Sequence, residues 1–150
     1  MSRDSSLFAR QAIIARLKGE PTVTALVPAE RIFPGERPPQ PEWPFIAYGR
    51  AVVTPFAASC LDGTAADVAL HVYAETTGEG DTTAPGEDMA AAIARVLVAV
   101  LDGAALDLAD TDCPWPATAH IHWSGTNVVP DNADGSAWHG IVSFSINVSS

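Results

Sequence analysis

Hydrophobic and polar residues alternate most regularly in the run Asp67-Val-Ala-Leu-His-Val-Tyr-Ala-Glu75. Its even positions are all apolar, whereas its odd positions mix charged, aromatic and small residues. Side chains alternate across a β-strand, so this period of two gives one apolar face and one mixed face. We therefore predict a central strand over residues 64–75 whose even-numbered face carries the hydrophobic core.

Residues 5–18 have the 3.6-residue period of an amphipathic helix, with apolar residues on one side. Ser5 or Ser6 suits its N-cap, and Gly19 suits its end. Arg10 falls in the same apolar stripe, where its stem can lie on apolar surface while its charged head reaches water. The alternative is that Arg10 contacts another subunit.

The clearest helical pattern covers residues 85–101, and Gly103 is expected to end it. Pro85 suits the first turn, and the acidic residues that follow suit the positive end of the helix dipole. The apolar stripe of this helix is Met89, Ile93, Val96, Leu97, Val100 and Leu101. A shorter helix is predicted over residues 22–27.

Four further segments are predicted to be extended: residues 31–33, 45–54, 118–124 and 137–148. In residues 118–124, Trp123 is expected to face the core, with His120 and His122 on the opposite face. Five prolines in residues 34–44 exclude a helix and a strand ladder, so we predict a stiff connector with Trp43 against the edge of the domain. Loops are expected at residues 55–63, 76–84 and 130–135.

Strands on both sides of a helix, each with one apolar face, predict an α+β fold. We expect a two-layer sandwich, in which a mostly antiparallel mixed sheet of four to five strands has two main helices packed on one face. The other face of the sheet would remain open. The chain, residues 1–150, is expected to form a single domain.

Composition narrows the functional class. The chain is 47% hydrophobic and 17% charged, which is typical of a globular protein, and its net charge is −10. An acidic balance disfavours a module that grips phosphate groups. No apolar run reaches the roughly 18 residues of a membrane span, and the N-terminus lacks a secretory pattern, so we expect synthesis in the cytoplasm and no membrane partner.

The strongest candidate for chemistry is His120-x-His122, because a period of two places both imidazoles on one face, where a metal could bridge them. His71 and His139 could share that face, with Asp112 or Asp67 as a further ligand. The alternative is that all four histidines are polar residues on an open sheet face. Cys60 and Cys113 have no metal-binding spacing; a reduced, structural role is expected, and a disulfide stays open. No nucleophile elbow, Walker A loop or dinucleotide motif is present.

Several stretches, in order, resemble the tail-completion or tail-terminator proteins of long-tailed phages and gene transfer agents. The stretches that carry the resemblance are residues 12–17, 23–26, 31–33, 44–49, 67–74, 90–97 and 139–144. The resemblance implies a ring, commonly of six copies, that caps the head-proximal end of the tail tube and docks onto the head connector. It implies no catalytic residues and no cofactor.

From this resemblance we expect a structural protein at the head–tail junction of a virion, made in the cytoplasm of a bacterial host. Its partners would be further copies of itself, the major tail tube protein, and a head–tail connector or stopper protein. The loops at residues 55–63, 76–84 and 129–136 would order against these partners. Candidate interface residues are Arg10, Arg50, Phe56, His71, His120, His122, Trp138 and His139.

Six copies at −10 each give a ring of about −60, which would repel the DNA backbone and let DNA pass through the lumen without specific binding. Two alternatives remain open at this point. The first is a head-side connector or stopper protein. The second is a metal-dependent enzyme that uses His120 and His122.

Overall fold

The computed structural model describes residues 3–58 and 61–149. The helices are α1 (Ser6–Lys18), α2 (Pro21–Thr24) and α3 (Gly86–Leu101), with 3-10 turns η1 (Ala29–Arg31), η2 (Gly80–Thr82) and η3 (Leu108–Asp110). The strands are β1 (Ile32–Phe33), β2 (Phe45–Tyr48), β3 (Val52–Ala58), β4 (Leu61–Glu75), β5 (Ala105–Asp107), β6 (Thr118–Pro130) and β7 (Ala137–Ser149). No helix among the described residues is both long and apolar enough to cross a membrane.

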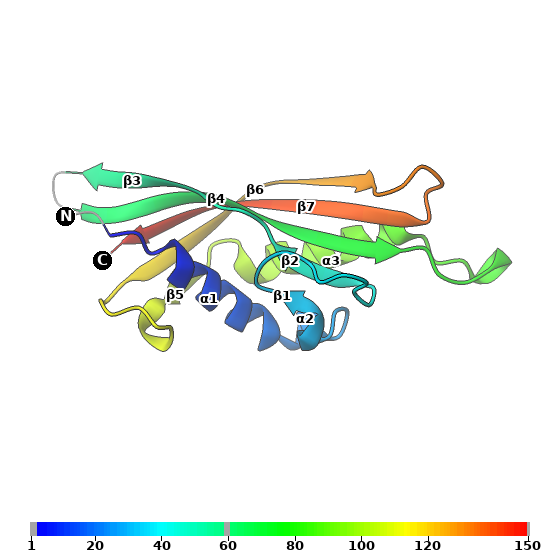
Figure 1. Ribbon diagram of the computed structural model, residues 1–150, viewed down its shortest axis with the longest axis horizontal. Coiled ribbons are helices and arrows are strands. Elements are labelled where there is room, and N and C mark those ends of the chain that lie inside the picture. The colour runs from blue at the N-terminus through cyan, green and yellow to red at the C-terminus, as the bar shows by residue number, and fades with distance from the viewer. Residues whose placement is uncertain (1–2, 59–60, 150) are drawn as a thin grey trace.

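All seven strands join one curled, mixed sheet in the order β1-β2-β4-β7-β6-β5, and β3 also pairs with β4 (Figure 1). Strand β4 lies at the centre. One side of β4 pairs with β7 from Gly63 to Glu75, and the other side is shared between β3 and β2. Only the β1–β2 pair is parallel. The predicted α+β class and central strand are therefore confirmed.

The sheet is larger than the four to five strands predicted. The segment predicted as one strand over residues 45–54 is two strands, because the chain leaves the ladder at Gly49 and rejoins β4 as β3. Within residues 55–63, predicted as a loop, residues 55–58 instead form most of β3 and residues 61–63 the start of β4, while residues 59–60 lie outside the described part of the chain. Pro55 suggested a loop, but an edge strand such as β3 tolerates a proline. Strand β1 falls within the predicted extended segment 31–33, whereas β5 was not predicted because it holds too few residues to show a period.

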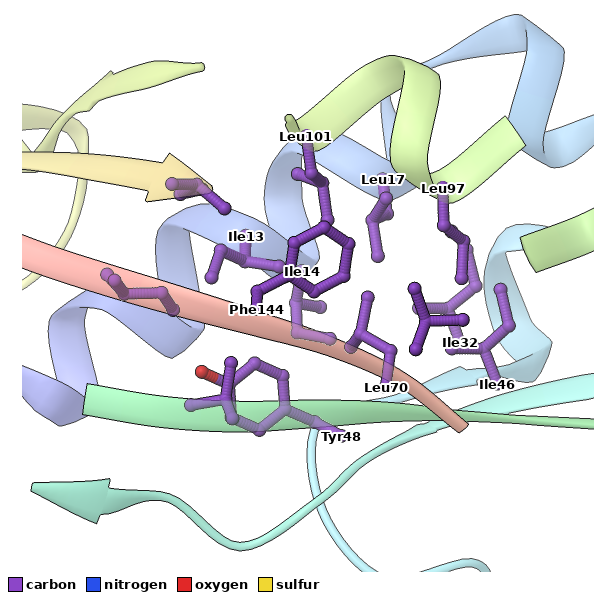
Figure 2. Packing of buried hydrophobic residues seen from close by; sticks show 14 of the residues in the cluster. Ile13, Ile14, Leu17, Ile32, Ile46, Tyr48, Leu70, Leu97, Leu101 and Phe144 are labelled. Atoms are coloured by element: carbon purple, nitrogen blue, oxygen red, sulfur yellow. The ribbon is translucent and has the colours of Figure 1, made fainter. Parts of the chain in front are cut away.

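Helices α1 and α3 lie on the same face of the sheet, as predicted (Figure 1). The even-numbered residues of β4 point into this layer, and Val68, Leu70, Val72 and Ala74 are between 0% and 4% exposed. Figure 2 shows Leu70 and Phe144 from the sheet meeting Leu17 of α1 and Leu97 and Leu101 of α3. This one-sided core holds the two layers together, because burial of apolar area is the main favourable term in folding.

Trp123 departs from the expected burial. It was predicted to face the core with Ala119 and Ile121, yet it is 45% exposed. Trp123 pairs with Phe144 in the same register as Ile121 with Ile146, so its side chain is on the predicted face, beside α3 over a shallow apolar hollow. The register of β6 shifts only after Trp123, so the period of two gave the right face; it could not show that α3 leaves this position partly uncovered.

Besides the short end strands β1 and β5, two longer stretches at the margins of the sheet lack a neighbouring strand among the described residues. The outer side of β3 is one, and it contains Pro55. The outer side of β6 pairs with β5 only at residues 118–120, and the strand ends at Pro130. Proline has no N–H, so neither position can donate a backbone hydrogen bond to an incoming strand.

Phe144 is 1% exposed at the centre of the core, so truncation to alanine leaves a cavity. We expect Phe144→Ala to lower the free energy of unfolding by about 3–5 kcal/mol. Leu7→Ala is the control, because Leu7 is 46% exposed on α1 and should cost about 0.5 kcal/mol or less. Urea denaturation followed by circular dichroism measures both. Equal losses for the two variants would contradict the assigned core.

Candidate functional site

The open face of the sheet carries a row of stacked rings. The strand registers place Phe45, Tyr73 and His139 side by side on β2, β4 and β7. The Phe45 and Tyr73 centroids are 4.6 Å apart with the rings 14° from parallel, and those of Tyr73 and His139 are 4.3 Å apart at 11°. These spacings are typical of offset stacking, which adds to the stabilisation from burial. We call Phe45, Tyr73, His139 and His71 the ring ladder.

The proline-rich connector folds back over one end of this ladder. The Trp43 ring packs edge-on against Phe45, with centroids 5.2 Å apart, and the Arg37 guanidinium lies 5.2 Å from the centroid of Tyr73. Arg31 ties the connector down, because its guanidinium donates to the Trp43 carbonyl at 3.0 Å and to Glu42 at 2.8 Å. Phe45 is therefore fully buried although it belongs to the face that was expected to remain open.

His71 and His139 form a hydrogen-bonded pair in which Nδ1 of His71 lies 2.7 Å from Nε2 of His139. Partial burial lowers the pKa of both imidazoles. The pKa of His139 is lowered further by the charge of protonated His71 and by Arg37, while Asp131 opposes these effects. In a neutral pair each imidazole keeps one N–H, so one ring donates across this contact and the other accepts.

Gly49 lets the end of β2 approach β4 more closely than a side chain would allow. Its N–H donates to the Ala69 carbonyl at 2.7 Å. A Cβ at this position would lie 2.7 Å from both the Ala69 oxygen and Nε2 of His71. Only a glycine fits this close approach without a shift of its neighbours, and the approach places Arg50 beside the ring ladder.

Two adjoining hollows of about 430 and 630 Å³ open at this place. They share residues 35–36 and 48–50 and have the side chains of three arginines on their walls: Arg10 from α1, Arg37 from the connector and Arg50. Tyr48 lies between the hollows and the core, and its burial raises the pKa of its phenol to about 12 even though Arg10 opposes the shift. We call this joined depression the arginine hollow. It is a polar recess with an aromatic wall.

The structure gathers some predicted interface residues and separates others. Arg10, Arg50 and His71 line the arginine hollow, and His139 adjoins it through His71. His120 and His122 are exposed on β6, away from that recess. Trp138 packs within the fold, where its Nε1 donates to the Gly135 carbonyl at 3.0 Å.

Two predicted positions fall wholly or partly outside the described residues. Phe56 belongs to β3, but its side chain lies outside the described part of the chain. Cys60 also lies outside it, and the disulfide question therefore stays open. The Cys113 thiol donates to the Trp115 carbonyl at 3.2 Å.

The ligand set of the metal hypothesis is not assembled. Within residues 3–58 and 61–149, no three His, Cys, Asp or Glu residues come together to hold a metal ion. His71 and His139 bond to one another, while His120 and His122 face solvent on β6. Period two correctly put each pair of histidines on a common face, but the strand registers keep the two pairs apart.

Sequence reasoning missed Arg37, Tyr48 and Tyr73 as members of the site. Tyr73 shares the odd face of β4 with His71, so the alternation held a signal for it. The sequence held no such signal for Arg37, because its position depends on how the connector folds back over the sheet.

These features define a two-layer α+β protein with an arginine-lined recess at one edge of its sheet. The same fold occurs in a chain of the virion of native gene transfer agent (GTA) particle, with a TM-score of 0.72, 17% identity, and 94% of each chain covered. Comparison with curated proteins gives no match. A family model described as tail completion protein gp17 matches residues 11–149. The chain therefore belongs to this family, and the resemblance noted in the sequence is confirmed.

Acid should weaken the fold through the His71–His139 pair. Both pKa values lie below the ordinary 6.5, so the unfolded chain binds protons more readily than the folded chain just below that pH. The contribution of this pair to the free energy of unfolding should be fully present above about pH 6.5 and be lost as the pH falls below that value. Denaturant unfolding across this range measures the loss.

The variant His139→Gln should reduce this pH dependence, because it removes one of the two titrating rings. His122→Gln is the matched control, since His122 is exposed on the same face of the sheet. Identical pH profiles for the wild type and His139→Gln would contradict the role assigned to the pair.

Proposed function

We propose that the protein is a structural component of a phage-like tail, without a catalytic role. In this proposal, copies form a ring, six in number, at the head-proximal end of the tail tube. The ring ends tube polymerisation and joins the tail to the head connector. The observation that carries the proposal is the match to the tail completion family across residues 11–149.

The fold supports a role in assembly. A ring of identical copies needs two different surfaces on each copy that fit one another. The arginine hollow lies at the β1–β2 side of the sheet, whereas the unpaired edge of β6 lies on the opposite side. The likeness to a chain from a gene transfer agent virion agrees with a place in such a particle.

The charge suits a passage for DNA. Six copies at −10 would give about −60, so a lumen lined by these chains would repel phosphate groups. DNA could then slide through without being held at specific positions. This part of the proposal concerns the assembled ring. Replacing acidic residues that line the lumen by basic ones should slow the passage of DNA.

The alternative within the same class is a head-side connector or stopper. It would use the same surfaces but would bind the connector and leave tube growth unchanged. The two roles differ in one observable quantity, which is the length of tail tubes assembled in the presence of the chain.

We expect the chain to form rings of six when it is mixed with the tail tube protein of the same particle. Native mass spectrometry gives the copy number, and electron microscopy gives tube length and the position of the added ring. Tubes should stop growing and carry the ring at one end only. An unrelated protein of similar acidity is the control for charge alone.

A chain that stays monomeric both alone and with tube protein contradicts the ring. Rings that form but leave tube length unchanged favour the stopper role instead. A monomer in the absence of tube protein is compatible with the proposal, because the ring can close on the tube.

A further inference from the structure

Charge is distributed very unevenly along the chain. Residues 1–50 hold seven of the eight Lys and Arg residues and five of the 18 acidic residues, for a net charge of +2. Residues 51–150 hold one Arg and 13 acidic residues, for a net charge of −12. The basic part builds α1, α2, β1, β2 and the connector. Arg10, Arg37 and Arg50 gather on the β1–β2 side of the sheet, whereas Arg16 of α1 lies beside acidic residues of the β5 side.

The arginine hollow lies on the β1–β2 side. Arg10, Arg37 and Arg50 line it, against the carboxylates of Glu36 and Asp131. Among the described residues, the ion pair formed here is Arg50 with Glu36, at 3.7 Å between side chains that are 96% and 92% exposed. Such an exposed pair contributes little to stability, so the Arg50 guanidinium is available to a stronger partner.

The segment between β4 and α3, residues 76–85, has the opposite character. It projects beyond the end of the sheet (Figure 1) and bears Glu79 and Asp81 at its tip. Residues 77–85 are all exposed, and no Lys or Arg occurs between Arg50 and Arg95. We call this segment the acidic finger.

The acidic finger is an ordered structure. Thr77 and Ala84 exchange backbone hydrogen bonds of 3.0 and 2.7 Å, and Thr82 donates to the Glu79 carbonyl through its backbone and its hydroxyl. At its base, the Thr76 N–H donates to the Ser136 carbonyl at 2.7 Å. A segment already held in shape loses little conformational entropy when it binds.

We propose that the acidic finger of one copy binds in the arginine hollow of the next copy. No residue of the finger lines the hollow of its own chain, so the contact joins different copies. Because the two surfaces are distinct, the contact is head-to-tail, which is the geometry that generates rings. The opposite charges steer approach and fix the orientation of the copies. This contact rests on the proposed ring, for which it supplies the interface between subunits.

DNA is a poor alternative occupant of the hollow, since the chain as a whole carries −10. A tail tube protein with an acidic loop is the remaining rival. The two cases can be told apart. If a tube protein occupied the hollow, a charge change in the hollow could not be compensated by an opposite charge change in the finger of this chain.

A reciprocal charge exchange tests the contact. Arg50→Glu makes the hollow acidic, and Asp81→Arg makes the finger basic; both side chains lie at the surface, so folding should be retained. Each variant alone repels itself at every interface. We expect the association constant measured by sedimentation to fall at least about tenfold for each variant. Tube protein is included in the sample if the wild-type chain forms rings only in its presence. Arg95→Glu, which removes an exposed arginine on α3, should change it by less than about threefold.

The decisive sample is an equal mixture of the two variants. The acidic hollow of Arg50→Glu accepts the basic finger of Asp81→Arg, and the unchanged hollow accepts the unchanged finger. Rings should therefore return, and native mass spectrometry should find them built of equal numbers of both chains. A local folding defect or a site for tube protein would not produce such alternating rings.

Three results overturn the proposal in distinguishable ways. If both variants form rings as well as the wild type does, the proposed contact is wrong but the proposed ring stands. A wild-type chain that never associates, alone or with tube protein, removes the ring and this contact together. Single variants that lose only tube binding, while the copies still associate, assign the hollow to the tube protein instead.

Discussion

The register of β4 is the constraint on which the rest of the structure depends. This strand pairs with β7 along one side and with β3 and β2 along the other, so its register fixes the position of every neighbour. Its even-numbered side chains from Val68 to Ala74 are buried in the core, and His71 and Tyr73 on its other face belong to the ring ladder. A slip of one residue would place His71 and Tyr73 in the core and expose Leu70 and Val72 to water. The core therefore locks the register, and the register in turn builds the site.

The strongest periodic signals were sufficient to predict the framework. The alternation in residues 67–75 identified β4 and its buried face, and the stripe of residues 89–101 identified α3 to within a residue. The missed elements have local causes. Pro55 suggested a loop in what is an edge strand, and β5 is too short to show a period. Trp123 is on the predicted face, but α3 leaves it partly uncovered. Parity placed His71 and His139 on one face, but their 2.7 Å contact depends on strand register, which no segment encodes alone.

The arginine hollow results from a hydrophobic residue on the polar face. Phe45 faces the side of the sheet opposite the helices, where water would otherwise contact it. The connector covers it with Trp43 and is anchored by Arg31. The connector therefore forms one wall of the recess and places Arg37 over Tyr73. Arg10 and Arg50 line the rest of the recess. A packing requirement and a candidate binding surface therefore have the same origin, and the stiff prolines keep that wall in place.

The prolines at the two bare margins of the sheet bear on the time before assembly. A protein of a virion tail has to meet its partners before other chains pair with its exposed strand edges. Long strands with open margins invite indefinite stacking into fibrils, because backbone groups pair without regard to side chains. Pro55 and Pro130 interrupt that backbone adhesion at both margins. Recognition of any partner protein at these margins is then left to side chains, which distinguish the right neighbour from the wrong one.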